Sequence, residues 1–184
     1  MADGHIELAR KDCEGDHLAR VDDAIDRSQA LIDDLLTLAR EGKEVTGSEP
    51  VELADVAKRS WEIVDTEHAT LEANAMPVIE ADRSRLQQLF ENLYRNAVEH
   101  GGDEVTVHVS ELDGGFYVAD TGSGIPESDR DEIFEAGYST ADHGTGFGLR
   151  IVERIVEAHG WDIRVVDGDR CGARFEITGV ETAH

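Results

Sequence analysis

The spacing of apolar residues predicts helical structure in the first 42 residues. Residues 5–12 have the composition of the last turns of a helix, and residues 13–15 interrupt it. A second helix is expected from Asp16 to about Glu41, because apolar positions recur at alternating spacings of three and four. These positions are Leu18, Val21, Ile25, Ser28, Ile32, Leu35 and Ala39. We therefore expect residues 1–42 to form part of a helical hairpin in a bundle. A single amphipathic helix packed on its own domain is the alternative.

The rest of the chain alternates between helix and strand patterns. Residues 42–50 are polar, contain two glycines and end in proline, which predicts a linker over residues 43–50 before a domain over residues 51–184. Helices are expected over residues 51–66, 82–100, 127–135 and 147–159. Strands are expected over residues 69–73, 77–80, 104–112, 116–120, 161–167 and 173–179. This order predicts an α+β fold, a two-layer α/β sandwich in which helices cover one face of a mixed sheet.

Two segments of this domain have clear apolar periodicity. The helix over 82–100 has Asp82 as a candidate N-cap, and its buried side is predicted to carry Leu86, Leu89, Phe90, Leu93 and Ala97. In residues 104–112 valines alternate with polar residues, as in a half-buried strand. These valines are Val105, Val107 and Val109.

The chain is strongly acidic. Its 41 Asp and Glu residues against 17 Lys and Arg residues give a formal net charge of -24 at pH 7. Because 40% of the residues are hydrophobic and regularly spaced, we interpret this as a folded protein with an acidic surface, not as a disordered chain. Such a charge disfavours binding to nucleic acid or anionic lipid. It suits concentrated salt, so we hypothesise a halophilic, archaeal source; folding without molar salt would count against this.

Neither the cysteines nor the hydropathy indicates an extracellular or membrane segment. Cys13 and Cys171 have no metal-binding spacing and are expected to be reduced structural residues. No apolar run approaches the ~18 residues of a membrane span, and residues 1–12 have no signal-peptide core. We expect a cytoplasmic protein with no membrane contact by this segment.

Three short segments carry candidate chemistry. The first, ENLYRNA at residues 91–97, places two asparagines on one helix face. The second, DTGSGIP at residues 120–126, has an aspartate before two glycines. The third, GTGFGL at residues 144–149, precedes a helix, where a glycine run lets backbone N–H groups meet an anion. Each segment alone is common in proteins, but their order and spacing together are specific.

These segments resemble the conserved boxes of the Bergerat-fold ATPases, which include histidine kinases and DNA gyrase. ENLYRNA resembles the N box, DTGSGIP the G1 box, IFEAGYS at residues 133–139 the F box and GTGFGL the G2 box, and all four occur in the order of the family. The resemblance covers residues ~50–180 and implies binding of ATP and Mg²⁺. It implies that Asn96, with Asn92, holds Mg²⁺ and that Asp120 accepts a hydrogen bond from the adenine amino group. Gly122 and Gly124 are implied to allow close approach to the base.

The resemblance also implies contacts at the phosphates. Gly144, Gly146 and Gly148 take the phosphates, and Phe134 anchors a lid over residues 136–146. The residues implied to bind the nucleotide are Asn92, Arg95, Asn96, His100, Asp120, Gly122, Gly124, Ile125, Phe134, Gly144, Thr145, Gly146, Phe147, Gly148 and Leu149.

Position 92 distinguishes members of the group. In gyrase and its hydrolytic relatives, the residue four before the magnesium asparagine is a glutamate that activates water. Here it is Asn92, and Glu91 points about 100° away around the helix. This pattern resembles the histidine kinases and implies slow ATP hydrolysis. One departure concerns Glu99, where histidine kinases often carry lysine; an acid there is unfavourable for phosphates, although Arg95 could supply positive charge. An acid-rich surface is the other explanation for Glu99.

The phosphoacceptor of a histidine kinase is not found. Residues 31–42 resemble the end of the dimerisation and phosphotransfer hairpin, but no histidine is followed by the acid-Leu-Arg-x-Pro run of the family. His5 and His17 lie 91 and 79 residues before Asn96, whereas the family spacing usually exceeds a hundred. We expect a truncated first helix, no autophosphorylation by this fragment and weak homodimerisation.

The expected partners are ATP, a separate phosphoacceptor histidine domain and a response regulator. A non-catalytic nucleotide-binding or dimerising regulatory module is the main alternative. A serine-directed anti-sigma-type kinase is a second, which the heptad hairpin disfavours.

Overall fold

The computed structural model describes residues 47–64, 68–74, 76–102, 104–130, 132–134, 146–168 and 172–183. The hairpin predicted over residues 1–42, with His5 and His17, lies outside these residues. The predicted site residues Gly144 and Thr145 also lie outside them. All structural statements below concern the described part of the chain.

One five-stranded sheet forms the first layer of the domain. Its strands are β2 (Thr70–Ala73), β4 (Thr106–Leu112), β5 (Gly115–Asp120), β7 (Ala173–Thr178) and β6 (Asp162–Asp167), in that order across the sheet. β2 pairs with β4 in parallel, and the other neighbours are antiparallel. The predicted mixed sheet is therefore confirmed. Five of the six predicted strands lie in it, with ends shifted by at most two residues, whereas the strand predicted over residues 77–80 is β3 (Val78–Ala81) and lies in a separate two-stranded sheet.

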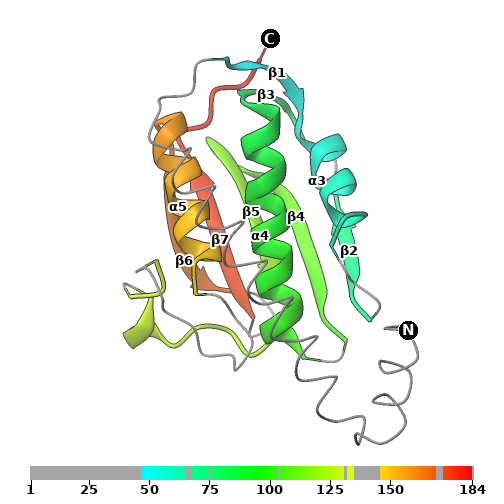
Figure 1. The fold of residues 1–184 in the computed structure, drawn as a ribbon, viewed down its shortest axis with the longest axis vertical. Coiled ribbons are helices and arrows are strands. Elements are labelled where there is room, and N and C mark those ends of the chain that lie inside the picture. The colour runs from blue at the N-terminus through cyan, green and yellow to red at the C-terminus, as the bar shows by residue number, and fades with distance from the viewer. Residues whose placement is uncertain are drawn as a thin grey trace, which may run out of the picture.

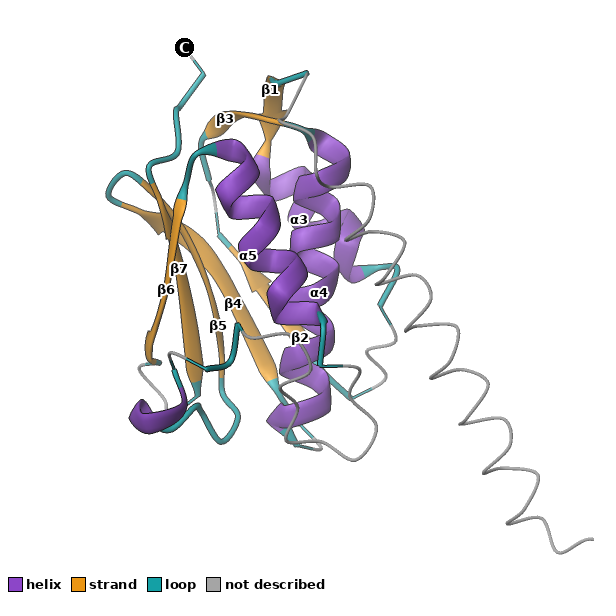
Figure 2. Ribbon diagram, turned by 60° about the vertical axis from the view of Figure 1, so that its left-hand side comes forward, coloured by secondary structure: helices purple, strands orange, loops and turns teal. Residues whose placement is uncertain are grey.

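Three helices form the second layer, and all lie on the same face of the sheet (Figures 1 and 2). They are α3 (Leu53–Trp61), α4 (Arg83–Gly101) and α5 (Gly148–His159). Between helices and sheet lies a core of aliphatic and aromatic side chains. It includes all five apolar residues predicted for the buried side of α4 and all three valines predicted for β4. The predicted two-layer sandwich is confirmed.

Asp82 begins α4 as predicted. Its side chain accepts hydrogen bonds from the backbone N–H groups of Ser84 at 3.0 Å and Arg85 at 3.2 Å. These bonds satisfy two of the N–H groups that the first turn of a helix leaves without partners. Local sequence chemistry was sufficient to locate this helix start.

The helix predicted over residues 51–66 is wrong at both ends. Val51 and its neighbours form β1 (Glu49–Glu52), which pairs with β3 (Val78–Ala81) and places Val51 opposite Ile79. The helix begins only at Leu53 and ends at Trp61. Pro50 favours extended backbone, and Val51 is buried against a strand almost thirty residues away, a contact that periodicity along the chain does not reveal.

The helix predicted over residues 127–135 is also wrong in its type and length. The described residues form a 3₁₀ helix, η1 (Glu127–Asp129), followed by a turn at residues 132–134. Ile133 and Phe134 are adjacent apolar residues in a polar segment, so they cannot provide the apolar stripe that a longer helix would bury.

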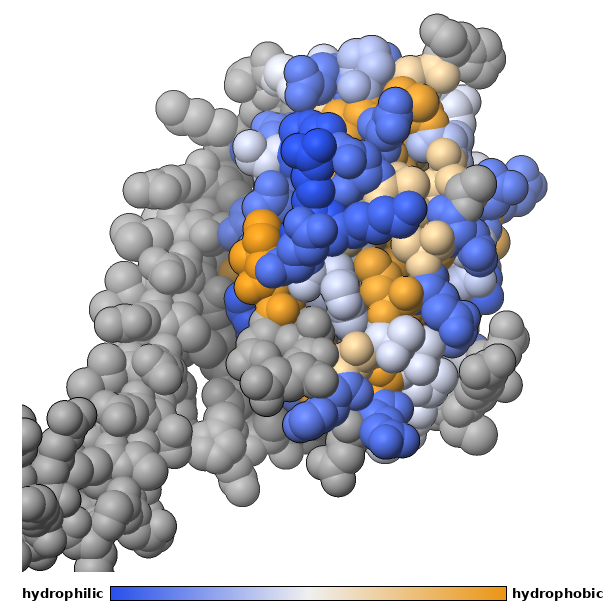
Figure 3. Space-filling model, turned by 90° about the vertical axis from the view of Figure 1, so that its right-hand side faces the viewer, coloured by the Kyte–Doolittle hydropathy of each residue, from blue (hydrophilic) through white to orange (hydrophobic). Residues whose placement is uncertain are grey.

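The surface mixes hydrophilic and hydrophobic residues on the side of the molecule that carries α3 and β2 (Figure 3). Among the described residues, Ile63 is the large hydrophobic side chain that is exposed, at 60%. No helix in the described ranges is both long and apolar enough to cross a membrane.

Candidate functional site

The predicted motifs meet at one end of the molecule. The last turns of α4, the end of β5, the first turn of α5, the end of β6 and the start of β7 lie toward the lower end of the domain in Figure 1. The contacts below join these segments. Residues about fifty positions apart in the sequence are thereby brought within hydrogen-bonding distance.

Asn92 faces the start of α5. Its side chain is buried, and its amide nitrogen donates to the backbone oxygen of Gln88 at 2.9 Å. Its Oδ1 is buried and accepts no hydrogen bond from any described residue. A Cβ added to Gly148 would lie 3.2 Å from this Oδ1, so the amide oxygen points at the first turn of α5. A buried acceptor without a donor costs about 1–3 kcal/mol, and a bound cation or donor would remove that cost.

The first turn of α5 has the geometry of an anion site. Phe147 is the N-cap residue of the helix, and its own side chain makes no capping hydrogen bond. Gly146 takes a φ of 72°, a conformation that suits glycine and directs the chain into the helix. The N–H groups at the start of a helix and the helix dipole favour a negative group at this position.

Asp120 ends β5 with its carboxylate largely buried. Its Oδ1 accepts hydrogen bonds from the N–H groups of Gly122 at 2.8 Å and Ala173 at 3.2 Å. Burial raises the pKa of Asp120, whereas these two hydrogen bonds and the charge of His100 act in the opposite direction. No described donor binds Oδ2. The carboxylate is thus held through one oxygen, and the other oxygen can accept a hydrogen bond from a ligand.

Gly122 is required by the packing of the strand end on α4. A Cβ at this position would lie 2.6 Å from the Cα of Gly101, the last residue of the helix. Gly124 takes a φ of 72° and turns the chain two residues later. Both glycines predicted beside the base are thus explained by backbone geometry next to Asp120.

The other predicted residues differ in their exposure. Asn96, His100, Ile125, Phe134 and Leu149 are half-buried, and the last three pack against the core. Arg95 and Glu99 are exposed on α4. The structure therefore brings Asn92 to the first turn of α5, with Asn96 one turn further along α4, and it places Asp120 with its glycines at the neighbouring strand end.

Gly172 and Ala173 are site residues that the sequence reasoning missed. A Cβ at Gly172 would lie only 1.9 Å from the backbone oxygen of Asp120, so the start of β7 contacts the end of β5 directly. This contact brings the Ala173 N–H group to the Asp120 carboxylate. Gly172, directly before the strand predicted over residues 173–179, was the only sign in the sequence of a close backbone contact. The local sequence does not show that Asp120 is the residue it contacts.

The donor set fits a magnesium ion held jointly with phosphates. Asn92 and Asn96 supply amide oxygens, and a hard cation prefers oxygen ligands. Among the described residues, no group of three or more His, Cys, Asp or Glu is arranged to hold a metal ion. An ion bound here would accordingly take most of its ligands from a nucleotide and water, as Mg²⁺ commonly does.

Comparison with known proteins identifies the family. A family model described as histidine kinase-, DNA gyrase B-, and HSP90-like ATPase matches residues 81–181, more than half of the chain. The chain belongs to this ATPase family. Within it, the ATPase domain is of the histidine kinase type, since the curated relatives are sensor histidine kinases. One of them, the sensor histidine kinase ZraS of Klebsiella oxytoca, is 36% identical over 162 residues, which are 82% of this chain and 35% of that protein.

Two solved structures resemble this ATPase domain. The mycobacterial sensor histidine kinase MprB is 28% identical, with a TM-score of 0.62 over 74% of this chain and 97% of that chain. Full-length ShkA, solved in complex with AMPPNP, is 28% identical, with a TM-score of 0.71 over 91% of this chain and 39% of that chain. The chain spans about a quarter to a third of the length of the curated relatives it matches.

Proposed function

We propose that residues 51–184 bind Mg-ATP and transfer its γ-phosphoryl group to a histidine of a protein partner. The observation that carries the proposal is the buried Oδ1 of Asn92, which has no hydrogen-bond partner among the described residues and is aimed at the first turn of α5. A cation acceptor and an anion-binding helix end side by side suit a metal–phosphate pair. The AMPPNP complex of ShkA supports a nucleotide as the ligand.

Different residues of the chain bind the metal, the phosphates and the base of the nucleotide. Asn96 and Asn92 hold Mg²⁺, which neutralises phosphate charge when bound. The residues from Gly144 to Leu149 take the phosphates, and Arg95 adds positive charge beside them. Asp120 accepts from the adenine amino group through its free Oδ2. Gly122, Gly124, Ile125, His100 and Phe134 complete the base side and the anchor of the lid.

Slow hydrolysis follows from position 92. An asparagine cannot accept a proton from water as a glutamate does, so no general base stands at this position. The γ-phosphoryl group is thereby preserved for a histidine side chain. The exposed Glu99 lies on the same helix, and its charge opposes phosphate binding unless salt screens it.

We propose the following setting for this domain. Residues 1–42 belong to a dimerisation and phosphotransfer hairpin. The linker predicted over residues 43–50 ends before β1, because Glu49 and Pro50 already lie in that strand. The partners are a histidine-containing domain and a response regulator in the cytoplasm, with weak homodimerisation through the hairpin. Residues 1–184 alone are not expected to autophosphorylate, because none of their histidines is followed by the acid-Leu-Arg-x-Pro run. The net charge of -24 supports a halophilic source.

The first test measures Mg-dependent binding of an ATP analogue by calorimetry in molar KCl. We expect the Asn96→Ala and Asp120→Ala variants to bind about tenfold more weakly or not at all, because each loses a ligand or hydrogen bond to a charged group. Asn74→Ala is the matched control, since its amide makes an exposed hydrogen bond to Ser110 beside the edge strand β2.

The outcomes separate the candidate functions. Wild-type protein that binds no analogue would contradict the proposal. Intact binding without transfer to any supplied histidine-containing domain would instead favour a regulatory, non-catalytic module.

A further inference from the structure

We propose that Arg130 is a positioning residue: it holds the two segments that donate hydrogen bonds to Asp120 in the arrangement in which Asp120 binds the nucleotide. The inference rests on the proposed nucleotide site. Arg130 follows η1 and belongs to none of the motifs described above. Its side chain is only 20% exposed, although it carries a charge at the surface of a small domain.

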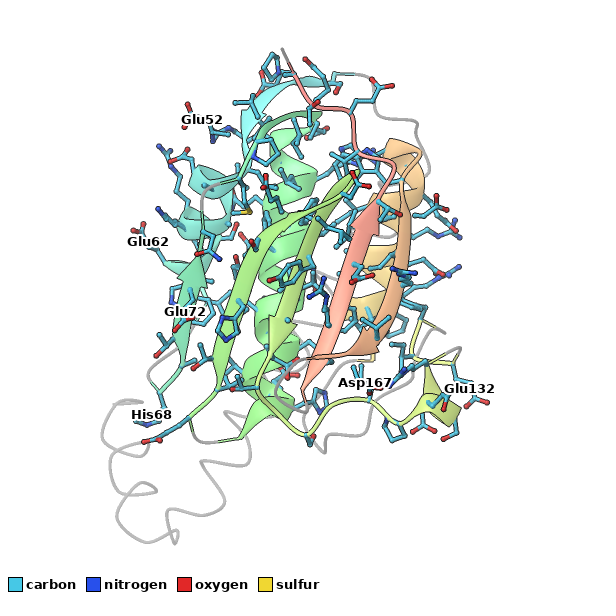
Figure 4. The ribbon with its side chains drawn as sticks, turned by 180° about the vertical axis from the view of Figure 1, so that it is seen from behind. Glu52, Glu62, His68, Glu72, Glu132 and Asp167 are labelled. Carbon is cyan, nitrogen blue, oxygen red and sulfur yellow. The ribbon has the colours of Figure 1, made fainter. Side chains whose placement is uncertain are left out.

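The guanidinium of Arg130 contacts two separate segments. Its Nε donates to the backbone oxygen of Ile125 at 3.2 Å, and its Nη2 forms an ion pair with Oδ1 of Asp167. Asp167 is the last residue of β6. Figure 4 shows it in the same lower part of the domain as Glu132. A planar guanidinium with donors in a fixed fork can bridge two acceptors in this way, whereas a lysine amine offers one point charge.

The first contact fixes the loop that leaves Asp120. Ile125 lies five residues after Asp120, beyond the left-handed turn at Gly124, and its side chain packs against the core. The N–H group of Gly122 in the same loop donates to the Asp120 carboxylate. Holding the Ile125 carbonyl therefore limits the movement of the loop that supplies one of the two donors to Asp120.

The second contact fixes the loop that supplies the other donor. Asp167 adjoins Gly168, whose N–H group donates to the backbone oxygen of Gly172 at 2.8 Å and closes the β6–β7 connection. Gly172 packs directly on the backbone of Asp120, and the next residue, Ala173, donates to the carboxylate. Arg130 therefore contacts both segments whose N–H groups donate to the Asp120 carboxylate.

The other arginine–acid pairs of the described residues have simpler structural roles. Arg59, Arg85, Arg150 and Arg154 pair with acids three or four residues away along the chain. Arg83 of α4 pairs with Asp55 of α3 and joins these two helices, away from Asp120. Arg164 and Arg174 pair with Glu176 on strands of the sheet. The pair of Arg130 and Asp167 spans 37 residues and joins two loops that both contact Asp120. Its position, more than its energy, indicates a role in the site, since exposed ion pairs typically contribute little.

The test compares ADP and GDP binding to the full chain, measured by calorimetry with Mg²⁺ in KCl at which the wild type is folded. Arg130→Met should weaken ADP binding about fivefold and lower the ratio of ADP to GDP affinity. Asp167→Asn should have a smaller effect, about twofold, because the hydrogen bond to Ile125 remains. A purely structural loss reduces the folded fraction and affects both nucleotides equally, so the ratio distinguishes positioning from stability.

Two matched controls remove the same charges elsewhere. Arg154→Met removes an arginine from an exposed pair on α5, and Glu132→Gln removes an exposed acid from the segment next to Arg130. Both should leave the affinity ratio unchanged. Exchanging the partners in an Arg130→Asp, Asp167→Arg double variant should recover part of the ratio, since the ion pair returns without the Ile125 hydrogen bond.

The outcomes separate this inference from the proposed function. If the wild type binds ADP and both Arg130→Met and Asp167→Asn keep its affinity ratio, the positioning role is wrong while the nucleotide site stands. If the wild type binds neither nucleotide, the proposed function fails, and the inference fails with it. Should Arg130→Met not fold, Asp167→Asn decides, because the Asp167 side chain is 82% exposed and we expect its replacement to leave the fold intact.

Discussion

Gly172 shows how one residue without a side chain determines the geometry of the site. The backbone φ of Gly172 does not require glycine, but the close contact with Asp120 does. A Cβ added to Gly172 would lie 1.9 Å from the Asp120 backbone oxygen and 2.5 Å from its Oδ1. The obstacle is mainly backbone, which cannot move aside as a flexible side chain can. The absence of a side chain allows β7 to start close enough to donate to Asp120.

Gly172→Ala should therefore damage both stability and binding. Forcing the start of β7 away from β5 costs about 1–3 kcal/mol and breaks the hydrogen bond from Ala173. We expect a lower free energy of unfolding by chemical denaturation and about tenfold weaker binding of adenine nucleotides by calorimetry. Gly47→Ala is the control, because nothing lies within 4 Å of a Cβ added there. Equal behaviour of the two variants would contradict the role of the close approach.

At the scale of elements, His159 joins the end of α5 to the start of α4, at the opposite end from the site. Its Nε2 accepts from the backbone N–H of Asp82 at 3.0 Å, its Nδ1 lies 2.7 Å from the oxygen of Ile155, and its ring stacks on Trp161. These partners require a neutral ring with the proton on Nδ1. Arg85 and the Asp82 carboxylate are the charged groups that face it.

The junction at His159 predicts a pH dependence of stability. Burial lowers the pKa of His159, against the opposing effects of the Ile155 carbonyl and Asp82, while Arg85 also lowers it. A lowered folded-state pKa means that the unfolded chain binds the proton more readily. The contribution to stability is full above the ordinary histidine pKa of about 6.5 and is lost as the pH falls below it.

The measurement is thermal unfolding between pH 7.5 and pH 5.5. The wild type should lose more stability over this interval than a His159→Gln variant, whereas the exposed His68→Gln variant should follow the wild type. Parallel curves for the wild type and His159→Gln would show that the junction does not titrate as described.

At the scale of the whole molecule, the net charge is the main influence on how stability depends on salt. A net charge of -24 on 184 residues opposes compaction through self-repulsion. The screening length falls from about 10 Å at 0.1 M salt to about 3 Å at 1 M, so added salt removes most of this repulsion. We expect the melting temperature to rise by at least about 2–4 °C, corresponding to ~1 kcal/mol, between 0.1 M and 2 M KCl.

Sucrose provides the control for this salt dependence, because it stabilises by exclusion from the surface without screening charge. A melting temperature that responds to sucrose but not to KCl would contradict the electrostatic explanation and, with it, the halophilic hypothesis.

Local chemistry allowed much of this protein to be predicted from its sequence. The apolar periodicity of α4, the alternation in β4 and the cap at Asp82 are properties of neighbouring residues, and the structure confirms them. The order of elements predicted the layered fold for the same reason. The motif order indicated the family, because its residues keep their spacing along the chain.

Contacts between distant residues were decided only by the tertiary structure. Val51 is a strand residue because it lies opposite Ile79, and Asn92 faces the first turn of α5 because α5 packs beside α4. Gly172 approaches Asp120 because β7 lies next to β5. The sequence by itself determined which residue types were available for a nucleotide. The pairing of strands and the packing of helices determined which of their atoms meet, since those free energies depend on neighbours that are remote along the chain.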